Sequence, residues 1–227
     1  LRYEFEKRQG AAYARQKAIQ VATSPLVGFL DDDTLPDMTW LTSAYQFAQE
    51  HPKAGVIASR IRGNFETDPP DNFERIAALL ALTERGSKPM MYAPSQKVIP
   101  PSAGMVVKRQ TWLDHVPQEL VLTGRTATSM LTGEDTESIL HIQQAGWEIW
   151  YNPHMRLQHQ IPTTRLTRPY LKKLCRGIGL SRYRTRMLSC TPWQRLPMLL
   201  VYLVNDVRKI MFHCLQYRQD VFLDDVA

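Results

Sequence analysis

The first half of the chain alternates between helix-like and strand-like hydrophobic patterns. Residues 11–22 consist mainly of good helix formers, and residues 36–51 place apolar side chains at near-helical spacing after a Pro–Asp start signal. Short apolar runs at residues 25–30 and 54–61 predict strands. This order of helix, strand, helix and strand favours an α/β fold whose sheet is mostly parallel.

The second half continues this pattern on both sides of one long irregular stretch. Residues 84–104 contain too much Pro, Gly and Ser for a regular element, and a stretch of this length within a compact domain is usually a functional loop. The remaining patterns predict a helix over 72–84, a strand over 103–108, a helix over 132–146 that Gly146 ends, and strands over 147–152 and 155–160.

Composition and charge divide the chain into two parts. Its 227 residues suit one large domain with an appendage, and its three cysteines lack the spacing of a disulfide framework or a zinc site. The net charge is +6, and no Asp or Glu occurs from Ile149 to Asn205. That segment holds ten basic residues: Arg156, Arg165, Arg168, Lys172, Lys173, Arg176, Arg182, Arg184, Arg186 and Arg195. We therefore expect a domain over 1–164 and a basic C-terminal region over 165–227, mainly helical between 166 and 218.

Three consecutive carboxylates follow the strand predicted at residues 25–30. Asp31, Asp32 and Asp33 would lie at the carboxyl end of that strand, where open α/β sheets bind ligands. Neighbouring carboxylates need a counter-charge, and Mg²⁺ or Mn²⁺ prefers such oxygen ligands while taking others from substrate phosphates. The alternative is a solvated acidic turn before the next helix, capped by Asp37. An EF-hand loop does not fit, because its glycine and its final glutamate are missing.

A second acidic pair, Glu134 and Asp135, begins the helix predicted at residues 132–146. Its simplest explanation is capping, since a helix N-terminus favours carboxylates. Combined with the Asp cluster, the pair suggests metal-assisted group transfer, in which a carboxylate takes a proton from an attacking hydroxyl and the metal neutralises a leaving diphosphate. His159 ends the last predicted strand and would be either structural, a metal ligand or a donor to phosphate.

Three stretches carrying four motifs resemble the family-2 glycosyltransferases, which have the GT-A fold. They are "GAAYARQKAIQVATSPLVGFLDDDTLPDMTWL", "PPSAGMVVKRQTW" and "GEDTESILHIQQAGWEIWYNPHMRLQH", and with their spacing the likeness covers roughly residues 8–160. Within that family, "HQIPTTRLTRPYL" resembles bacterial exopolysaccharide enzymes such as the hormogonium polysaccharide glycosyltransferases. The resemblance implies an α/β fold with a Rossmann-like mixed sheet flanked by helices, followed by a C-terminal helical appendage.

The resemblance also implies roles for the acidic residues. Asp31 and Asp33 match the Asp-x-Asp motif, with Asp33 as a direct ligand of Mn²⁺ or Mg²⁺, Asp31 as a further metal and donor contact nearer the ribose, and Asp32 as the intervening donor-site residue. Asp135 would be the catalytic base, and Glu134 would support acceptor binding. Transfer would then be inverting and would need no covalent enzyme intermediate.

Other positions match the donor side of the family pattern. Arg15 would lie near the nucleotide, with Gln16 where the family usually has Asn. Ala103 and Gly104 would let the backbone approach the donor sugar, and His159 would face the metal and the diphosphate. The Gln-x-x-Arg-Trp motif of processive synthases is absent from the sequence, which favours transfer of a single sugar.

Family members begin with two base-binding strands that nothing before Gly10 matches, so we expect that an N-terminal portion is missing.

The basic tail is amphipathic and would lie on an anionic membrane, which suits a saccharide or lipid-linked acceptor and a cytoplasmic location at the inner face of the plasma membrane. Alternatively, its helices pack on the domain and show a solvated basic face. Nucleic acid is not an expected partner, since no recognition motif is present.

Two other function classes remain open from sequence alone. "FLDDDT" resembles the strand end of a haloacid-dehalogenase-type phosphatase, although Leu35 stands where that family has Thr or Val. A non-enzymatic alternative is an inactive module that binds membranes or polyanions through residues 165–195.

Overall fold

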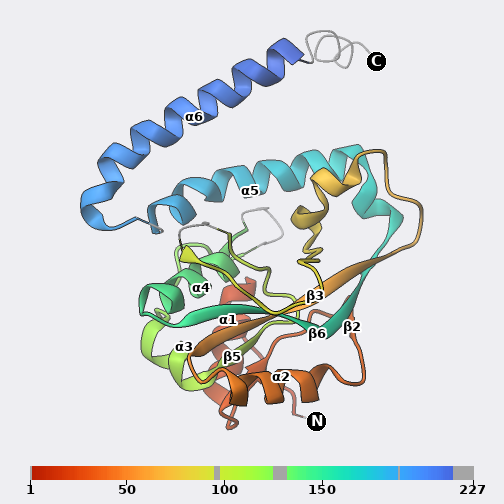
Figure 1. Ribbon diagram of the computed structural model, residues 1–227, viewed down its shortest axis with the longest axis vertical. Helices are drawn as coiled ribbons and strands as arrows, with labels where there is room; N and C mark the ends of the chain where they lie inside the picture. The colour runs from red at the N-terminus through yellow and green to blue at the C-terminus, as the bar shows by residue number, and fades with distance from the viewer. Residues whose placement is uncertain (1, 95–97, 125–131, 189, 217–227) are drawn as a thin grey trace. The chain divides into compact units, whose positions relative to one another are not determined.

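The computed structural model describes residues 2–94, 98–124, 132–188 and 190–216. Its internal contacts divide the chain into two compact units, Leu1–Thr185 and Arg186–Ala227. The first unit contains a mixed sheet with helices on both faces (Figure 1). The division expected at residue 164 stays a prediction about domain organisation.

The sheet is mixed, and most of its pairings are antiparallel. Its strands are β1 (Leu26–Gly28), β2 (Thr34–Pro36), β3 (Ala54–Phe65), β4 (Met90–Met91), β5 (Val106–Lys108) and β6 (Glu148–Ile161). They follow the order β1-β5-β3-β6-β2, with β4 also paired to β6, and among these pairs β3 and β6 alone run parallel. The expectation of mostly parallel strands was therefore wrong, because four short strands pair without the crossover helices that parallel pairing requires.

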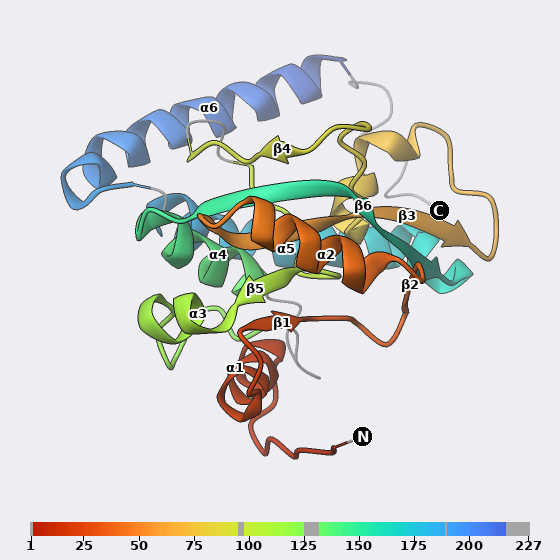
Figure 2. The same cartoon turned by 60° about the horizontal axis from the view of Figure 1, so that its bottom comes forward.

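The sheet lies between two apolar layers. On β3, Val56 and Ala58 join the cluster that packs against α1 (Ala11–Val21), α3 (Arg109–His115) and α4 (Glu134–Gln144). The intervening Ile57 joins the cluster that packs against α2 (Trp40–Glu50), which lies across β3 and β6 in Figure 2. This alternation follows from the two-residue period of a strand that is covered on both faces.

Several element predictions were confirmed and others were wrong. The helices predicted at 11–22, 36–51 and 132–146 correspond to α1, α2 and α4, and Gly146 has the positive φ of 88° expected after a helix end. The described part of 84–104 is irregular apart from β4, and residues 95–97 lie outside the described residues. The two strands predicted at 147–160 form the single strand β6, which continues through Asn152 and Pro153 with a register shift.

The helix predicted over 72–84 is absent. In its place are two 3₁₀ turns, η1 (Phe73–Arg75) and η2 (Ala77–Leu80), bounded by positive φ angles at Asn72 and Ala81. Phe73 and Leu80 are buried with Ile161 and Leu174, so the apolar spacing serves tertiary packing instead of a regular helix. The strands β2 and β4 and the helix α3 were not predicted.

The basic C-terminal region is helical over its described residues, as expected; residues 217 and 218 lie outside them. The helix α5 (Arg168–Leu188) belongs to the first unit up to Thr185, and there it buries Leu174 and packs Tyr170, Leu171 and Ile178 against the η1–η2 segment. Many of its basic side chains, including Lys172, Lys173 and Arg176, lie in solvent. α5 thus packs on the domain and leaves a basic face in solvent, which is the arrangement that the sequence offered as the alternative to membrane binding.

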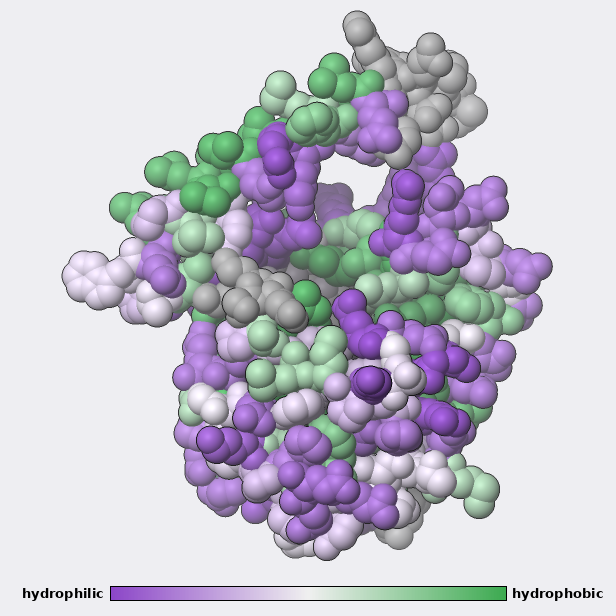
Figure 3. Space-filling view, in the orientation of Figure 1, coloured by the Kyte–Doolittle hydropathy of each residue, from purple (hydrophilic) through white to green (hydrophobic). Residues whose placement is uncertain are grey.

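The second unit contains α6 (Arg195–Gln216), a helix without a buried residue. Exposed apolar side chains recur along it at helical spacing: Leu196, Leu199, Leu200, Leu203, Val204, Val207, Ile210, Met211 and Leu215. We call this set the α6 apolar stripe, and it contributes to the hydrophobic surface of that helix in Figure 3. Among the described residues, no helix combines the length and apolar content that crossing a membrane requires.

Glu137 on α4 connects three segments of the first unit. Its side chain is 1% exposed and accepts hydrogen bonds from the backbone N–H of Leu122 at 2.7 Å and of Val121 at 3.2 Å. It also pairs with Arg184 of α5 at 3.0 Å. Because buried carboxylates are rarely tolerated without such partners, Glu137 is a structural carboxylate that holds α4 and α5 in place.

We predict that Glu137→Ala lowers the free energy of unfolding by about 3 kcal/mol, because two backbone N–H groups lose their acceptor and Arg184 loses its pair. Urea denaturation measures this change. Glu119→Ala is the matched control, since the Glu119 side chain is 82% exposed. Equal effects of the two substitutions would show that Glu137 has no anchoring role.

Candidate active site

One cavity of about 520 Å³ in the first unit collects most of the residues singled out from the sequence. Seven of them contribute to its lining: Arg15, Asp31, Asp33, Ala103, Glu134, Asp135 and His159. They come from α1, the β1–β2 turn, the segment before β5, the start of α4 and the end of β6. The two acidic clusters, although distant in sequence, therefore open onto the same space.

Pairing of β2 with β6 brings the first acidic cluster to His159. Thr34 lies opposite His159 in this antiparallel pair, and the backbone N–H of Gln160 donates to the Asp33 carbonyl at 2.8 Å. The Thr34 hydroxyl donates to the Asp31 carbonyl at 2.8 Å and closes the turn that precedes β2. Strand register thus fixes the Asp33 side chain beside the imidazole.

Asp33, His159 and Arg165 form a compact polar group. Asp33 Oδ2 lies 3.3 Å from His159 Nε2 and 2.7 Å from Arg165 Nη1. Arg165 Nη1 also lies 3.1 Å from His159 Nε2, and His159 Nδ1 lies 2.9 Å from the Leu80 carbonyl oxygen. The Leu80 carbonyl only accepts and the Arg165 guanidinium only donates, so these two contacts assign the proton of a neutral imidazole to Nδ1 and its lone pair to Nε2.

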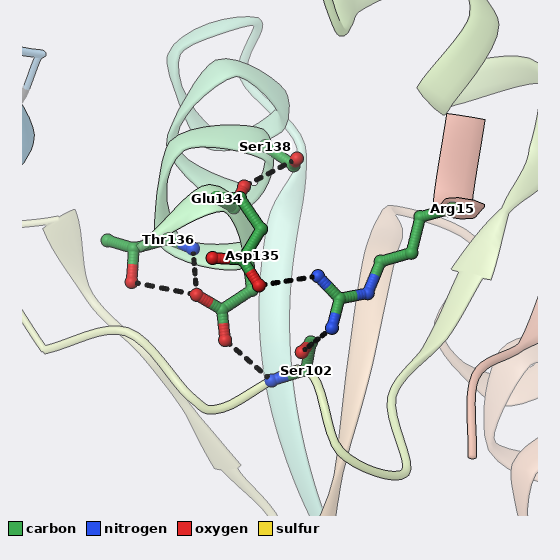
Figure 4. A network of polar contacts seen from close by, with 6 residues as sticks. All are labelled: Arg15, Ser102, Glu134, Asp135, Thr136 and Ser138. Carbon is green, nitrogen blue, oxygen red and sulfur yellow. Dashed lines mark hydrogen bonds and ion pairs between the residues drawn. The ribbon is translucent and has the colours of Figure 1, made fainter. Parts of the chain in front are cut away.

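The second acidic cluster lies at the N-terminus of α4 (Figure 4). Asp135 Oδ2 accepts a hydrogen bond from the backbone N–H of Ser102 at 3.2 Å, and its Oδ1 accepts one from the backbone N–H of Thr136 at 2.7 Å. Two backbone donors therefore orient this carboxylate at the cavity wall. The Thr136 hydroxyl also donates to Oδ1 at 3.5 Å, so Oδ2 is the oxygen that keeps a further lone pair for a proton.

Arg15 joins α1 to the rest of this cluster. Its Nη1 lies 3.1 Å from Glu134 Oε1 and its Nη2 donates to the Ser102 hydroxyl at 2.7 Å, as Figure 4 shows. Both charged side chains are largely buried, at 13% and 12% exposed. The guanidinium thus fixes Glu134 and, through Ser102, the segment that binds Asp135.

Two carboxyl groups of the cavity have shifted pKa values. Burial raises the pKa of Glu134, the adjacent Asp135 raises it further, and Arg15 opposes the shift. The pKa of Asp31 is also raised, mainly by desolvation, and Asp33 adds to this while Arg15 acts against it. The cavity therefore disfavours additional negative charge unless a cation enters with it.

Two predicted donor-site residues are not among those that line the cavity. Asp32 is exposed to solvent. Gly104 has a φ of 68°, and a Cβ at this position would collide with the Leu157 side chain. Packing against β6 and a left-handed backbone conformation thus account for this glycine. The donor-site roles of both residues stay predictions.

Comparison with known proteins agrees with the motifs. Residues 2–113 match the family model described as "Glycosyl transferase family 2". This segment of the chain belongs to glycosyl transferase family 2.

Two curated relatives of this family-2 chain are also named as glycosyltransferases. The glucosyl-dolichyl phosphate glucuronosyltransferase of Haloferax volcanii is 22% identical over 69% of this chain and 49% of its own length. The pre-mycofactocin glycosyltransferase of Mycobacterium tuberculosis is 26% identical over 66% of this chain and 30% of its own. The family-2 chain thus spans about half or less of the length of these relatives.

A solved structure described as the crystal structure of GalNAc-T7 with UDP, GalNAc and Mn²⁺ is similar to this family-2 chain with a TM-score of 0.49. The sequence identity is 14%, and the likeness covers 78% of this chain and 36% of that one.

Sequence reasoning missed two polar residues of this family-2 site. Ser102 donates its backbone N–H to Asp135 and accepts a hydrogen bond from Arg15 on its hydroxyl, but its only signal was its place in the "PPSAG" motif. Arg165 was counted only as one of the basic residues of the tail. Nothing in a sequence pattern distinguishes an arginine that contacts Asp33 from arginines that lie in solvent.

We predict that wild-type stability, relative to Glu134→Gln, falls as the pH rises from 4.5 through the elevated pKa of Glu134. A carboxyl whose pKa is raised on folding binds its proton more tightly in the folded state, so deprotonation costs folding free energy. Melting temperatures across this pH range measure the difference. Glu119→Gln, at an exposed position, should show no such trend, and a constant difference for Glu134→Gln would contradict the prediction.

Proposed function

We propose that this family-2 chain performs inverting, metal-dependent transfer of a single sugar from a nucleotide-sugar donor to a saccharide or lipid-linked acceptor. The observation that carries this proposal is the convergence of the Asp33–His159 pair and Asp135 on one cavity. One side of such a cavity suits a cation and a diphosphate, and the other offers a proton acceptor. The likeness to exopolysaccharide enzymes supports a role in cell-surface polysaccharide synthesis.

The residues around Asp33 fit a divalent cation. Asp33 Oδ1 is buried and has no hydrogen-bond partner among the residues that the structure describes, and Asp33 Oδ2 and His159 Nε2 present two electron pairs 3.3 Å apart. Among the described residues, no group of three or more His, Cys, Asp and Glu side chains could enclose a metal. Mg²⁺ or Mn²⁺ held by Asp33 and His159, with Asp31 nearby, would thus need oxygens from substrate and water, as Mg²⁺ usually does. When bound, it would neutralise charge on the leaving diphosphate.

The chain's own residues supply the acid–base chemistry and the positioning. Asp135 accepts the proton of the acceptor hydroxyl, whose oxygen forms a bond to the anomeric carbon as the bond to the diphosphate breaks. Ser102 and Thr136 hold the carboxylate in place, and Arg15 holds Glu134 beside it for acceptor binding. Attack from the face opposite the leaving group inverts the anomeric centre.

We expect Asp135→Asn to lower transfer turnover by about 10²- to 10⁴-fold, because the amide cannot take the proton, while donor binding stays nearly unchanged. The donor nucleotide is first identified on the natural full-length protein by thermal shift with a panel of nucleoside diphosphates, with and without Mn²⁺. Turnover and donor affinity are then measured separately.

Asp33→Asn is the matched control, since it should weaken nucleotide binding only in the presence of Mn²⁺. Wild-type turnover in Asp135→Asn would remove this residue from the base role. Hydrolysis of phosphomonoesters without any need for a sugar nucleotide would support the phosphatase alternative, which the family match disfavours.

We also propose that the chain acts at the inner face of the plasma membrane, with α6 on an anionic bilayer surface. The α6 apolar stripe is exposed, and Trp193, Arg195, Arg208 and Lys209 flank or interrupt it, a combination that suits the interface between lipid headgroups and acyl chains. α5 offers less apolar surface than the sequence suggested, because Leu174 is buried and Leu171 and Ile178 are partly buried in the domain. The Haloferax relative, whose name refers to a dolichyl phosphate, supports a lipid-linked acceptor.

We predict that Leu203→Glu lowers partitioning onto vesicles rich in phosphatidylglycerol by roughly tenfold or more, the effect of losing one buried leucine. Co-sedimentation measures it. Asn205→Glu adds the same charge to α6 outside the stripe and should change binding much less. Equal effects would exclude a membrane role for the stripe, and a change of oligomeric state in Leu203→Glu would show that a second copy covers it instead.

The same vesicle assay tests the inactive-module alternative. That alternative requires vesicle binding that survives joint replacement of Asp33 and Asp135 by Asn, together with no nucleotide binding by the wild-type protein.

A further inference from the structure

Arg165 occupies the position where a cation is expected. Its Nη1 lies 2.7 Å from Asp33 Oδ2 and 3.1 Å from His159 Nε2, the two atoms that the proposed function assigns to a divalent ion. A guanidinium and a metal ion both need electron pairs from these atoms. One lone pair cannot serve a hydrogen bond and a coordinate bond at the same time, so the two cations compete.

With its proton on Nδ1, the imidazole of His159 presents an acceptor 3.3 Å from the acceptor Asp33 Oδ2, and a cation between the two stabilises this arrangement. His159 donates from Nδ1 to the Leu80 carbonyl, so its Nε2 lone pair points toward the carboxylate of Asp33 at 3.3 Å. The two N–H groups of Arg165 Nη1 can bridge these two acceptors, one to each. The arginine thus keeps both in a binding arrangement when no metal is present.

The arginine satisfies only part of the carboxylate. Asp33 Oδ1 is buried and lacks a hydrogen-bond partner among the described residues, while the Arg165 side chain is 30% exposed. Asp33 therefore retains capacity for a stronger cation with more than one open coordination position. Arg165 therefore neutralises the charge of the Asp33 carboxylate but leaves one of its oxygens, Oδ1, available to another cation.

The position of Arg165 in the fold allows its guanidinium to leave without a change in the backbone. It belongs to the 3₁₀ turn η4 (Thr163–Leu166), which follows β6 and is fixed where Glu66 accepts from the Thr163 backbone N–H at 2.8 Å. Arg165 and its neighbours Tyr170 and Arg182 line the same cavity. Rotation about the side-chain bonds of a long arginine is enough to move its charge within that space.

We infer that Arg165 occupies the metal position in the metal-free protein, where it holds Asp33 and His159 together. When a divalent ion takes this position, the Arg165 guanidinium moves to the diphosphate. We call this the placeholder role of Arg165. This inference rests on the proposed function. It makes Arg165 a positioning residue for the metal and a binding residue for the leaving group. Arginine suits the second role because its planar donors match phosphate oxygens.

Two binding measurements test this, and neither requires turnover. In the first, Mn²⁺ alone is titrated and free Mn²⁺ is followed by electron paramagnetic resonance. Arg165→Gln should bind Mn²⁺ about tenfold more tightly than wild type, since the ion no longer displaces a charge-assisted hydrogen bond. In the second, at saturating Mn²⁺, the nucleoside diphosphate that stabilises wild type most should bind about tenfold more weakly to Arg165→Gln.

The controls separate competition from a general loss of charge or fold. Arg176→Gln removes an equal charge from an exposed position of α5 outside the cavity lining and should match wild type in both titrations. Adding Asp33→Asn to Arg165→Gln should abolish the gain in Mn²⁺ affinity. Arg165→Lys keeps the charge but lacks the forked donors of arginine, so its Mn²⁺ affinity should lie between those of wild type and Arg165→Gln. If Arg165→Gln does not fold, the Mn²⁺ affinity of Arg165→Lys relative to wild type tests the inference.

Opposite changes for metal and diphosphate are the signature of the placeholder role, because a merely structural arginine would weaken both ligands together. Mn²⁺ affinity in Arg165→Gln equal to or below that of wild type overturns the inference while leaving the proposed function intact. Absence of Mn²⁺ binding in every variant, with and without nucleotide, overturns the proposed metal site and the inference with it.

Discussion

Antiparallel pairing of β2 with β6 is the constraint on which the candidate site depends. It sets Thr34 opposite His159 and ties the Asp33 backbone to Gln160, so that an acidic turn and an imidazole from distant segments share one cavity wall. β6 in turn is held by its long parallel pairing with β3 in the centre of the sheet. Because strand register has a period of two, a one-residue slip would turn His159 away from Asp33.

Charge balance organises the rest of the cavity. Each carboxylate cluster has an arginine from a separate element: Arg15 of α1 pairs with Glu134, and Arg165 of η4 pairs with Asp33. The difference lies in how the two arginines are held. Arg15 also donates to Ser102 and is nearly buried, whereas Arg165 is more exposed and bridges two acceptors. The Arg15–Glu134 pair is therefore a fixed part of the site, whereas Arg165 can be replaced at Asp33 by another cation.

The two helices of the basic C-terminal region differ in how they are packed. α5 packs its apolar side on the η1–η2 segment and contributes Arg182 to the cavity and Arg184 to the buried Glu137. α6 buries nothing and keeps an apolar stripe in solvent. The two helices also differ in charge, because α5 carries seven Lys or Arg side chains and no carboxylate, whereas α6 carries three together with Asp206.

The sequence by itself determined the principal helices, the central strands and the two acidic clusters, because periodicity and the Asp-x-Asp and Glu-Asp motifs are local properties. It also carried the family resemblance. Only the tertiary structure decided the mostly antiparallel sheet, the 3₁₀ turns in place of the helix at 72–84, and the structural explanation for Gly104. It alone selected Ser102 and Arg165, since a pattern records residue types and spacing but not which side chains meet across the fold. Pairing between strands and contacts between segments that are distant in the sequence decide which side chains meet.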